Sequence, residues 1–452
     1  MSRGKPSAIL WRFSLPLLIS VIFQQLYNIA DSVVAGQFAG DAALAAVGAS
    51  YPVTMIFMAF ATGSNIGVSV VVSQLFGAKE YEQMKTAINT ALISIIGLGA
   101  ILTAGGLLTS RLLLAVLSTP SEIFADAVLY LNVYILGMIF LSLYNICTGI
   151  FTALGDSRTP LYFLIASSLG NIALDVLFVA GFNMGVAGVA WATFLAQGVA
   201  SLLAFFTLLR RVKALPHEGC PKRFSGRMLS RIAVVAIPSI LQQAFISVGN
   251  LFIQRLVNDF GADVIAGYSG AIKLNTFAVT GFTALANGLS TFSAQNVGAG
   301  TLSRVPKGFR AGLVMVMCFA VPVALLFCLG NHFVMGLFVE SGSSPAVISA
   351  GGWFLRIVAP FYPVVAVKLI ADSVLRGAGR MSAFMITTFS DLILRVVLAF
   401  LFSGPFGSTG IWMSWPVGWG IAAIMSVVFY ASGLWRKGHA SSEEDLRQAA
   451  GK

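Results

Sequence analysis

The chain has 452 residues, of which 57% are apolar and only 10% are Asp, Glu, Lys or Arg. Soluble domains carry about a quarter charged residues, so a soluble enzyme, a soluble nucleic-acid-binding protein and a disordered scaffold are excluded. The formal net charge of +11 would suit a nucleic-acid partner, but the basic residues gather between long apolar runs. The apolar content matches about twelve membrane helices of ~21 residues each.

The apolar runs predict twelve membrane-spanning helices. In chain order they cover residues 14–36, 50–75, 86–108, 124–146, 161–181, 185–208, 233–257, 268–295, 311–337, 351–375, 383–403 and 410–434. The first run resembles a signal peptide, but Gln24, Gln25 and Asn28 follow where a small-residue cleavage site would stand. It is therefore predicted to remain as the first span.

The Lys and Arg residues indicate how these spans are oriented. Most of the 28 basic residues lie in segments that are cytoplasmic if the N-terminus is cytoplasmic, and the densest group lies in residues 210–231. Cytoplasmic loops of membrane proteins carry this excess of positive charge. The sequence therefore predicts a multi-pass protein of the cell (inner) membrane with both termini in the cytoplasm. No nucleic-acid partner is expected.

The two halves of the chain resemble each other. Pro16, near the start of the first span, recurs near the start of the seventh as Pro238. Asn28 recurs at the same offset as Asn250. The polar segment 210–231 separates six spans from six. Since six is an even number, both halves insert in the same orientation, and we expect a pseudo-twofold axis along the membrane normal.

The predicted fold is therefore an all-α integral membrane protein with twelve transmembrane helices in two six-helix bundles. Its predicted parts are an N-terminal bundle at 1–215, a cytoplasmic linker at 216–231, a C-terminal bundle at 232–435 and a cytoplasmic tail at 436–452. Repeated halves with a substrate path at their interface are typical of alternating-access transporters. We expect a monomer surrounded by membrane lipid.

Ionisable side chains inside spans are costly, and they are candidates for function unless a partner neutralises them. Lys368 and Asp372 lie four residues apart, which puts them on one helix face. Asp391 and Arg395 have the same spacing. We interpret each as a self-neutralising structural pair.

Asp31 and Asp175 have no cation three or four residues away. Both lie on spans that run outward, roughly 8 Å before the outer boundary at 1.5 Å per residue. Asn171 shares a helix face with Asp175, and Thr193 on the next span reaches a similar depth. Such carboxylates can exchange protons, or hold Na⁺ together with amide and hydroxyl oxygens. The chain has no GxxxxGK[ST] phosphate loop, so we expect a gradient of H⁺ or Na⁺ to drive transport, without any other cofactor.

The stretches around these residues resemble the multidrug and toxic compound extrusion (MATE) family. The matching stretches are Pro16–Asp31 (PLLISVIFQQLYNIAD), Ala153–Pro160 (ALGDSRTP), Asn171–Asp175 (NIALD), Gly185–Thr193 (GVAGVAWAT) and Leu375–Gly379 (LRGAG). The similarity covers essentially the whole chain and is closest to the DinF-like branch. The resemblance implies a secondary active multidrug efflux antiporter that exports small organic cations in exchange for H⁺ or Na⁺.

The resemblance also implies where the coupling ion binds. In the DinF-like branch the ion site lies in the N-terminal bundle. Its motifs fall on Tyr27, Asp31, Asn171, Asp175 and Thr193, and Na⁺ would be held by Asp31, Asn171, Asp175 and Thr193. Another branch uses acidic residues of the seventh and eighth spans, but here the apolar parts of those spans contain no Asp or Glu. The N-terminal site is therefore favoured.

Polar residues elsewhere in the spans are candidates for substrate contact: Gln24, Asn28, Asn145, Gln242 and Asn250. One alternative function is a lipid-linked oligosaccharide or lipid flippase of the same superfamily, which would line its cavity with cations. A structural membrane protein without transport is a second alternative, and the two carboxylates without a cation on their own helix argue against it. Enzymatic activity is not expected, because the 3 His form no HExxH pattern.

Overall fold

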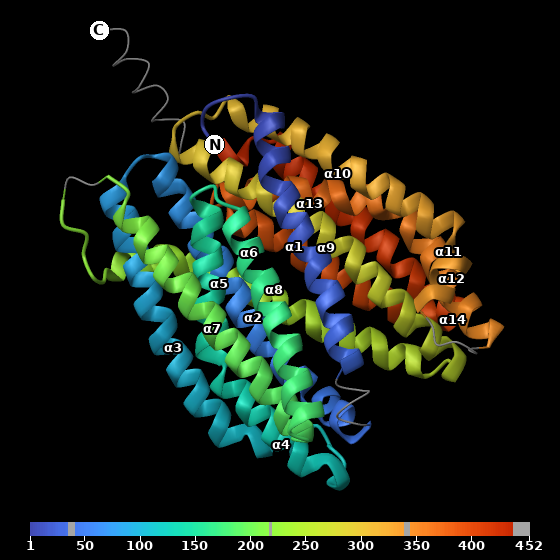
Figure 1. Cartoon of the computed structure of the whole chain (residues 1–452). Coiled ribbons are helices and arrows are strands. Elements are labelled where there is room, and N and C mark those ends of the chain that lie inside the picture. The colour runs from blue at the N-terminus through green and yellow to red at the C-terminus, as the bar shows by residue number, and fades with distance from the viewer. Residues whose placement is uncertain (35–40, 217–218, 339–343, 437–452) are drawn as a thin grey trace. The chain divides into compact units, whose positions relative to one another are not determined.

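The computed structural model describes residues 1–34, 41–216, 219–338 and 344–436, with the backbone alone at 31–34 and 41–44. This part of the chain consists of helices joined by turns and loops, and it contains no β-strand (Figure 1). In lipid every backbone N–H and C=O must find a partner, and a helix satisfies them within one segment. The predicted all-α fold is confirmed.

The helices of the first half are α1 (Pro6–Val34), α2 (Asp41–Gly77), α3 (Tyr81–Val116), α4 (Ser121–Leu136), α5 (Met138–Ala153), α6 (Arg158–Asp175), the π-helix η2 (Val176–Gly181) and α7 (Gly185–Lys213). Those of the second half are α8 (Gly226–Asn258), α9 (Ala262–Gly298), α10 (Arg304–Leu329), α11 (Asn331–Phe338), α12 (Pro345–Val358), η3 (Ala359–Phe361), α13 (Tyr362–Gly377), α14 (Met381–Ala431) and η4 (Leu434–Arg436). Within the described residues, each predicted span corresponds to one of these helices or to consecutive ones.

In the described part of the chain, nine helices are long and apolar enough to cross a membrane. Together α4 and α5 form a tenth span, which bends by 43° at Gly137. Two predicted spans are joined in α14 at a kink, where Gly407 adopts a φ of 59°. The remaining predicted span is α9, whose many Gly, Ser, Thr and Asn residues make it less apolar. Small residues of this kind suit a helix packed among others, because they allow close approach.

The sequence repeat is matched by a repeat in backbone geometry. Gly155 after α5 and Gly379 after α13 adopt left-handed conformations, with φ of 86° and 75°. In both turns the next N–H donates to the carbonyl five residues before it, at 2.9 and 2.8 Å, which is the usual way for a glycine to end a helix. Lys79 after α2 and Gly300 after α9 form a second equivalent pair, with φ of 60° and 67°.

Lys79 is strained relative to its counterpart Gly300, because the left-handed region costs a non-glycine residue about 1 kcal/mol. We therefore expect Lys79→Gly to raise the free energy of unfolding by about 0.5–1 kcal/mol, and Gly300→Lys to lower it by a similar amount. Thermal unfolding of the purified protein in detergent measures both effects. Lys79→Gln is the control for the lost charge, and an equal gain in that variant would contradict the backbone explanation.

The described chain forms two compact units. Unit 1 comprises Met1–Leu18 and the described residues from Phe245 onward, and unit 2 comprises Ile19–Ala244. Helix α1 therefore begins in unit 1 and continues into unit 2, while α8 begins in unit 2 and continues into unit 1. The predicted division at 216–231 assigned each of these helices to one bundle. A sequence shows where the chain becomes polar, but not which part of a long helix packs on which partner.

In unit 2, α2 packs against α3, α4 and α5, while α7 packs against α4, α5 and α6 (Figure 1). Buried apolar side chains such as Leu75, Met84 and Ile146 fill the space between α2, α3 and α5. Helix α2 also approaches α8 very closely. A Cβ atom placed on Gly67 would lie 2.5 Å from the Cβ of Ala236, so only glycine fits at this contact.

In unit 1, α9 packs against α10, α12 and α13, and α13 packs against α10 and α14. Large aromatic side chains such as Phe282, Phe354 and Trp412 fill its core. Gly288 of α9 stands at the repeat position of Gly67, and a Cβ placed on it would overlap the Ser14 side chain of α1. The first parts of α1 and α8 therefore make equivalent contacts, each with the second helix of the other half of the sequence.

Candidate functional site

Two of the predicted ion-coupling residues lie at the end of α6. Asn171 and Asp175 are one turn apart, and both are buried, with 3% and 1% of their surface exposed. Asp175 is the last residue of α6, and the helix widens into the π-helix η2 immediately after it. Turns of π-helix are rare and occur frequently at functional sites. The predicted Asn-x-x-x-Asp pair is thus held on one helix face in the interior of unit 2.

Asn171 connects three helices of unit 2. Its amide nitrogen faces Asp175 Oδ2 at 3.2 Å and also the Tyr27 hydroxyl of α1. Its amide oxygen accepts a hydrogen bond from the backbone N–H of Thr193 on α7, at 3.1 Å. This orientation satisfies both ends of the amide, because the opposite one would set its oxygen against a carboxylate oxygen. Tyr27, Asn171, Asp175 and the Thr193 backbone are therefore brought together, while their role in ion coupling stays a prediction.

The fifth predicted residue, Asp31, has a side chain outside the described residues. The helical backbone of α1 places it one turn after Tyr27, on the same helix face. Its closeness to Asp175 stays a prediction, and so does a Na⁺ site that includes it. Among the described residues, no group of three or more His, Cys, Asp and Glu side chains is arranged to hold a metal ion.

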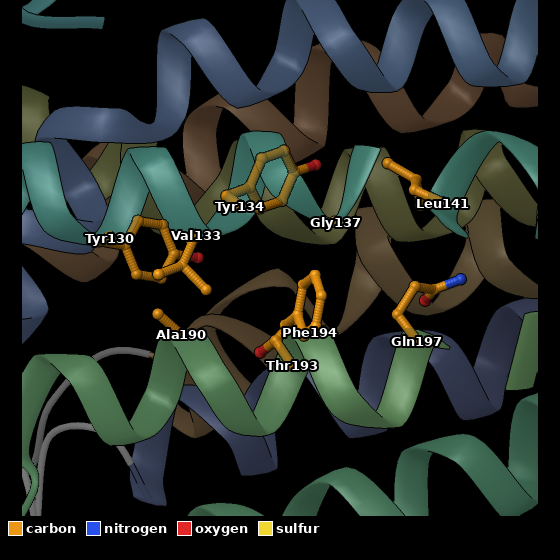
Figure 2. Close-up of a pocket in the computed structure, with 9 residues that line it drawn as sticks. All are labelled: Tyr130, Val133, Tyr134, Gly137, Leu141, Ala190, Thr193, Phe194 and Gln197. Carbon is orange, nitrogen blue, oxygen red and sulfur yellow. The ribbon is translucent and has the colours of Figure 1, made fainter. Parts of the chain in front are cut away.

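A small pocket opens beside Thr193, between α7 and the span formed by α4 and α5 (Figure 2). Its lining residues are Tyr130, Val133, Tyr134, Gly137, Leu141, Ala190, Thr193, Phe194 and Gln197. About 50 Å³ of it is open to the centres of water molecules, which is room for about four waters. The pocket therefore suits water or a small ion and is too small for a polyaromatic cation.

Sequence reasoning missed this pocket, although one signal for it was present. Tyr130 and Tyr134 lie four residues apart on a predicted span, so their side chains share a helix face. Their rings stack, with centroids 6.4 Å apart. The spacing alone does not show that α7 faces them with Thr193 and Gln197, because that contact depends on tertiary packing.

Comparison with known protein families identifies the group to which this arrangement belongs. The family model named MatE matches residues 16–177 and 238–401. The chain belongs to the MatE family. The two matched segments fall in the two halves of the sequence repeat, and the family consists of membrane transporters. The protein is therefore a multi-pass membrane transporter.

Relatives with curated names match nearly the whole chain of this MatE protein. The probable multidrug resistance protein YpnP of Bacillus subtilis (strain 168) is 28% identical over 425 residues, which is 94% of each chain. The multidrug export protein MepA of Staphylococcus aureus (strain NCTC 8325 / PS 47) is 25% identical over 405 residues, which is 88% of each chain. These names state the functions of the two relatives and do not by themselves assign a substrate to this chain.

Solved structures share the fold of this MatE protein. A MATE protein crystallised in complex with MaL6 superposes with a TM-score of 0.90 at 24% identity, over 96% of this chain and 98% of that one. A MOP superfamily transporter from Pyrococcus furiosus, described as having a binding pocket of reverse polarity, superposes with a TM-score of 0.89 at 24% identity, over 96% and 97%. The predicted fold class is confirmed.

The side chains predicted to contact substrate make local contacts or lie in different units. Gln24 donates to Asn28 one turn along α1, at 3.4 Å. Asn145 donates to a backbone carbonyl of its own helix at 2.9 Å. Gln242 belongs to unit 2, and Asn250 belongs to unit 1. A substrate role for these residues stays a prediction.

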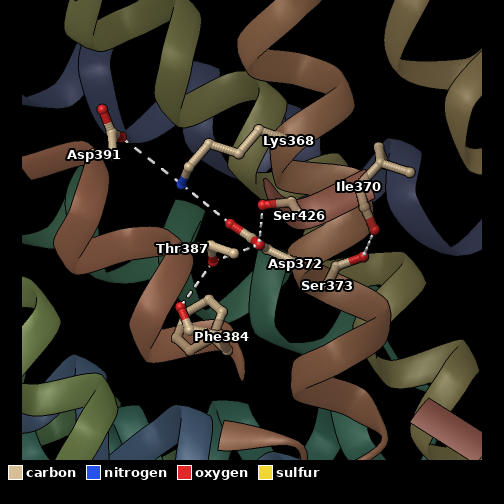
Figure 3. A network of polar contacts seen from close by, with 8 residues as sticks. All are labelled: Lys368, Ile370, Asp372, Ser373, Phe384, Thr387, Asp391 and Ser426. Carbon is tan, nitrogen blue, oxygen red and sulfur yellow. Dashed lines mark hydrogen bonds and ion pairs between the residues drawn. The ribbon is translucent and has the colours of Figure 1, made fainter. Parts of the chain in front are cut away.

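A second group of buried charged side chains lies in unit 1 (Figure 3). Lys368 donates to Asp372 at 3.1 Å, which confirms this predicted pair. The predicted pairing of Asp391 with Arg395 is wrong. Asp391 lies 3.8 Å from the Lys368 nitrogen on α13, while the Arg395 guanidinium lies over the Trp415 ring, 4.3 Å from its centre. A neighbouring helix supplies the cation, and the aromatic face takes the guanidinium.

Proposed function

We propose that this MatE protein is a secondary active multidrug efflux antiporter, which exports small organic cations across the cell membrane in exchange for protons. The names of its relatives, a probable multidrug resistance protein and a multidrug export protein, support multidrug export. The basic residues at one set of span ends support cytoplasmic termini. The choice of the proton rests on the closeness of the Asn171 amide to Asp175 and to the Thr193 N–H, which assigns its nitrogen to the carboxylate and its oxygen to the N–H.

The Asn171 amide is arranged for a carboxyl group that binds a proton. Hard cations such as Na⁺ are coordinated by several oxygens. The Asn171 oxygen is already engaged by the Thr193 N–H, and its nitrogen faces Asp175. A Na⁺ ion held by the Asp175 carboxylate and the Asn171 oxygen would require the amide to turn over and lose both contacts. A proton needs only one oxygen of Asp175 and leaves the amide in place.

Protonation of Asp175 changes a contact that reaches α1. The ionised carboxylate accepts a charge-assisted hydrogen bond from Asn171, and protonation weakens this bond by removing the charge. Asn171 also bonds to Tyr27 of α1, a helix that contributes residues to both units. The charge of Asp175 therefore biases the position of a helix that the two units share. Such a link between ion binding and a movable element is what alternating access requires.

The flippase alternative would require a cavity lined with cationic side chains. A lipid-linked oligosaccharide carries an anionic pyrophosphate group, which Lys and Arg side chains recognise. The nine residues that line the described pocket include no charged side chain. That pocket is too small for either substrate, so the preference for organic cations rests on the similarity to the MATE family.

Transport by the purified protein in lipid vesicles tests the proposal. With equal Na⁺ on both sides, an imposed pH gradient should drive a fluorescent organic cation such as ethidium across the membrane in the direction opposite to the proton flow. A Na⁺ gradient at equal pH should drive no transport of the dye. Protein-free vesicles are the control for partition of the dye into lipid. Transport driven by Na⁺ alone would contradict proton coupling, and transport driven by neither gradient would contradict antiport.

A further inference from the structure

The buried group around Lys368 contains two carboxylates in different environments (Figure 3). Asp372 Oδ1 accepts hydrogen bonds from Thr387 at 2.9 Å and from Ser426 at 2.7 Å, and its Oδ2 accepts one from Lys368 at 3.1 Å. Both oxygens of Asp372 are satisfied by donors from α13 and from α14. Asp372 therefore has a complete set of hydrogen-bond donors in the packed helices.

Asp391 has no comparable set of hydrogen-bond donors, although only 6% of its surface is exposed. Its Oδ2 lies 3.8 Å from the Lys368 nitrogen, beyond hydrogen-bond distance, and its buried Oδ1 has no hydrogen-bond partner. A Cβ placed on Gly418 would lie 3.1 Å from this Oδ1. The oxygen therefore faces the part of α14 that follows the kink at Gly407. Thr388, one turn before Asp391, has a buried hydroxyl that also lacks a partner.

The charges around Asp391 leave it dependent on a shared cation. On α13, Lys368 lies between Asp391 and Asp372, and the buried Arg376 also interacts with Asp372. On α14 the nearest cation is Arg395, which Tyr268 of α9 faces. Arg356 of α12 lies over the Trp353 ring. Lys368 bonds to Asp372 and only approaches Asp391. A buried carboxyl group without hydrogen bonds costs free energy in either form, and it costs far more when it is ionised than when it is protonated.

We propose that Asp391 is a second proton-binding site, located in unit 1, and that Lys368 couples its charge to Asp372. When Asp391 takes a proton from water, the new O–H bond removes its negative charge, and Lys368 pairs with Asp372 alone. When the proton returns to water, Lys368 is shared by both carboxylates. Asp175 belongs to unit 2, so the protein binds one proton in each unit. Use of the second proton in transport rests on the proposed antiport, but proton binding itself does not.

Infrared difference spectroscopy of the purified protein during a pH change detects this proton directly, because a protonated carboxyl group has its own C=O band. The measurement is made in an Asp175→Asn background, which removes the first site. The other carboxyl groups of the chain titrate as well, so we expect the carboxylic acid signal that grows as the pH falls to lose one component after a further Asp391→Asn substitution. Unfolding temperatures of both proteins show that they are folded.

Two further variants in the same background separate a proton site from a structural network. Lys368→Met removes the shared cation, so the component assigned to Asp391 should persist to a higher pH than in the background protein. Asp372→Asn leaves Lys368 to Asp391 alone, so the band should appear only at a lower pH. If Asp391 had only a structural role, these two substitutions would not shift the pH at which a carboxylic acid band appears in opposite directions.

The infrared measurement tests proton binding by Asp391 and does not depend on the result of the transport assay. A carboxylic acid signal that Asp391→Asn leaves unchanged overturns the second proton site whatever drives transport. If the proposed antiport is also correct, the wild type should import two protons per exported monovalent cation and Asp391→Asn should import one. An unchanged ratio in Asp391→Asn would contradict the use of this proton in transport.

Discussion

Replacement of Asp175 by Asn is expected to reduce pH-driven export of organic cations to the level of protein-free vesicles. The substitution keeps the size of the side chain and its ability to accept from Asn171, which lies 3.2 Å away, but it removes the group that takes up the proton. Since the buried carboxylate is replaced by a neutral amide, insertion and folding should be unaffected. Dye export from vesicles, with unfolding temperature recorded in parallel, measures both effects.

Asp156→Asn is the matched control for this substitution, because it removes a carboxylate at the other end of α6. Asp156 caps the start of the helix by accepting from the Thr159 backbone N–H at 3.1 Å and the Thr159 hydroxyl at 2.8 Å. Asn caps helices as well as Asp does, so this variant should export at the wild-type rate. Wild-type export by Asp175→Asn would remove Asp175 from the mechanism, and equal losses in both variants would point to a general effect of lost charge.

Leucine at Gly67 or at Gly288 is expected to lower the free energy of unfolding by about 2–3 kcal/mol, the range for overpacked interiors. At Gly67 the added side chain would meet Ala236 of α8, and at Gly288 it would meet Ser14 of α1. In both places backbone or short side chains leave no room for it. Unfolding temperatures in detergent, together with the yield of inserted protein, measure the loss.

Gly97→Leu is the control for a larger side chain on a membrane helix, because a Cβ at this exposed position of α3 meets nothing within 4 Å. It should be neutral or slightly stabilising, since Leu favours helix more than Gly does. If Gly67→Leu were as stable as this control, the close approach of α2 and α8 would be wrong. If only one of the two leucine variants were destabilised, the equivalence of the two halves would be wrong.

The sequence predicted the spans well because lipid imposes long apolar helices, and composition records them. It also predicted the repeat, since equivalent turns need the same residues, as at Gly155 and Gly379. The bend at Gly137 within the fourth span and the π-helix after Asp175 were not predicted, because apolar residues suit straight, bent and widened helices alike. The division of α1 and α8 between two units also depends on tertiary contacts that no local pattern records.

The candidate site was predicted only in part, because some of its contacts are local to one helix and others depend on how the helices pack. Spacing along one helix brought Asn171 and Asp175 together, and the family resemblance added Tyr27 and Thr193. Spacing failed for Asp391, because its cation comes from α13 and not from its own helix. Pairing across helices requires the packed structure, in which the unequal support of Asp372 and Asp391 becomes visible.

The central claim, that Asp175 exchanges a proton for each exported cation, is tested most directly by recording cation export and internal pH in the same vesicles. A pH-sensitive dye trapped inside reports proton movement while the fluorescent cation reports export. We expect proton flux to rise in step with cation flux in the wild type and in Asp156→Asn, and both fluxes to be absent in Asp175→Asn. Cation export without any accompanying proton flux, or undiminished proton flux in Asp175→Asn, would contradict the account.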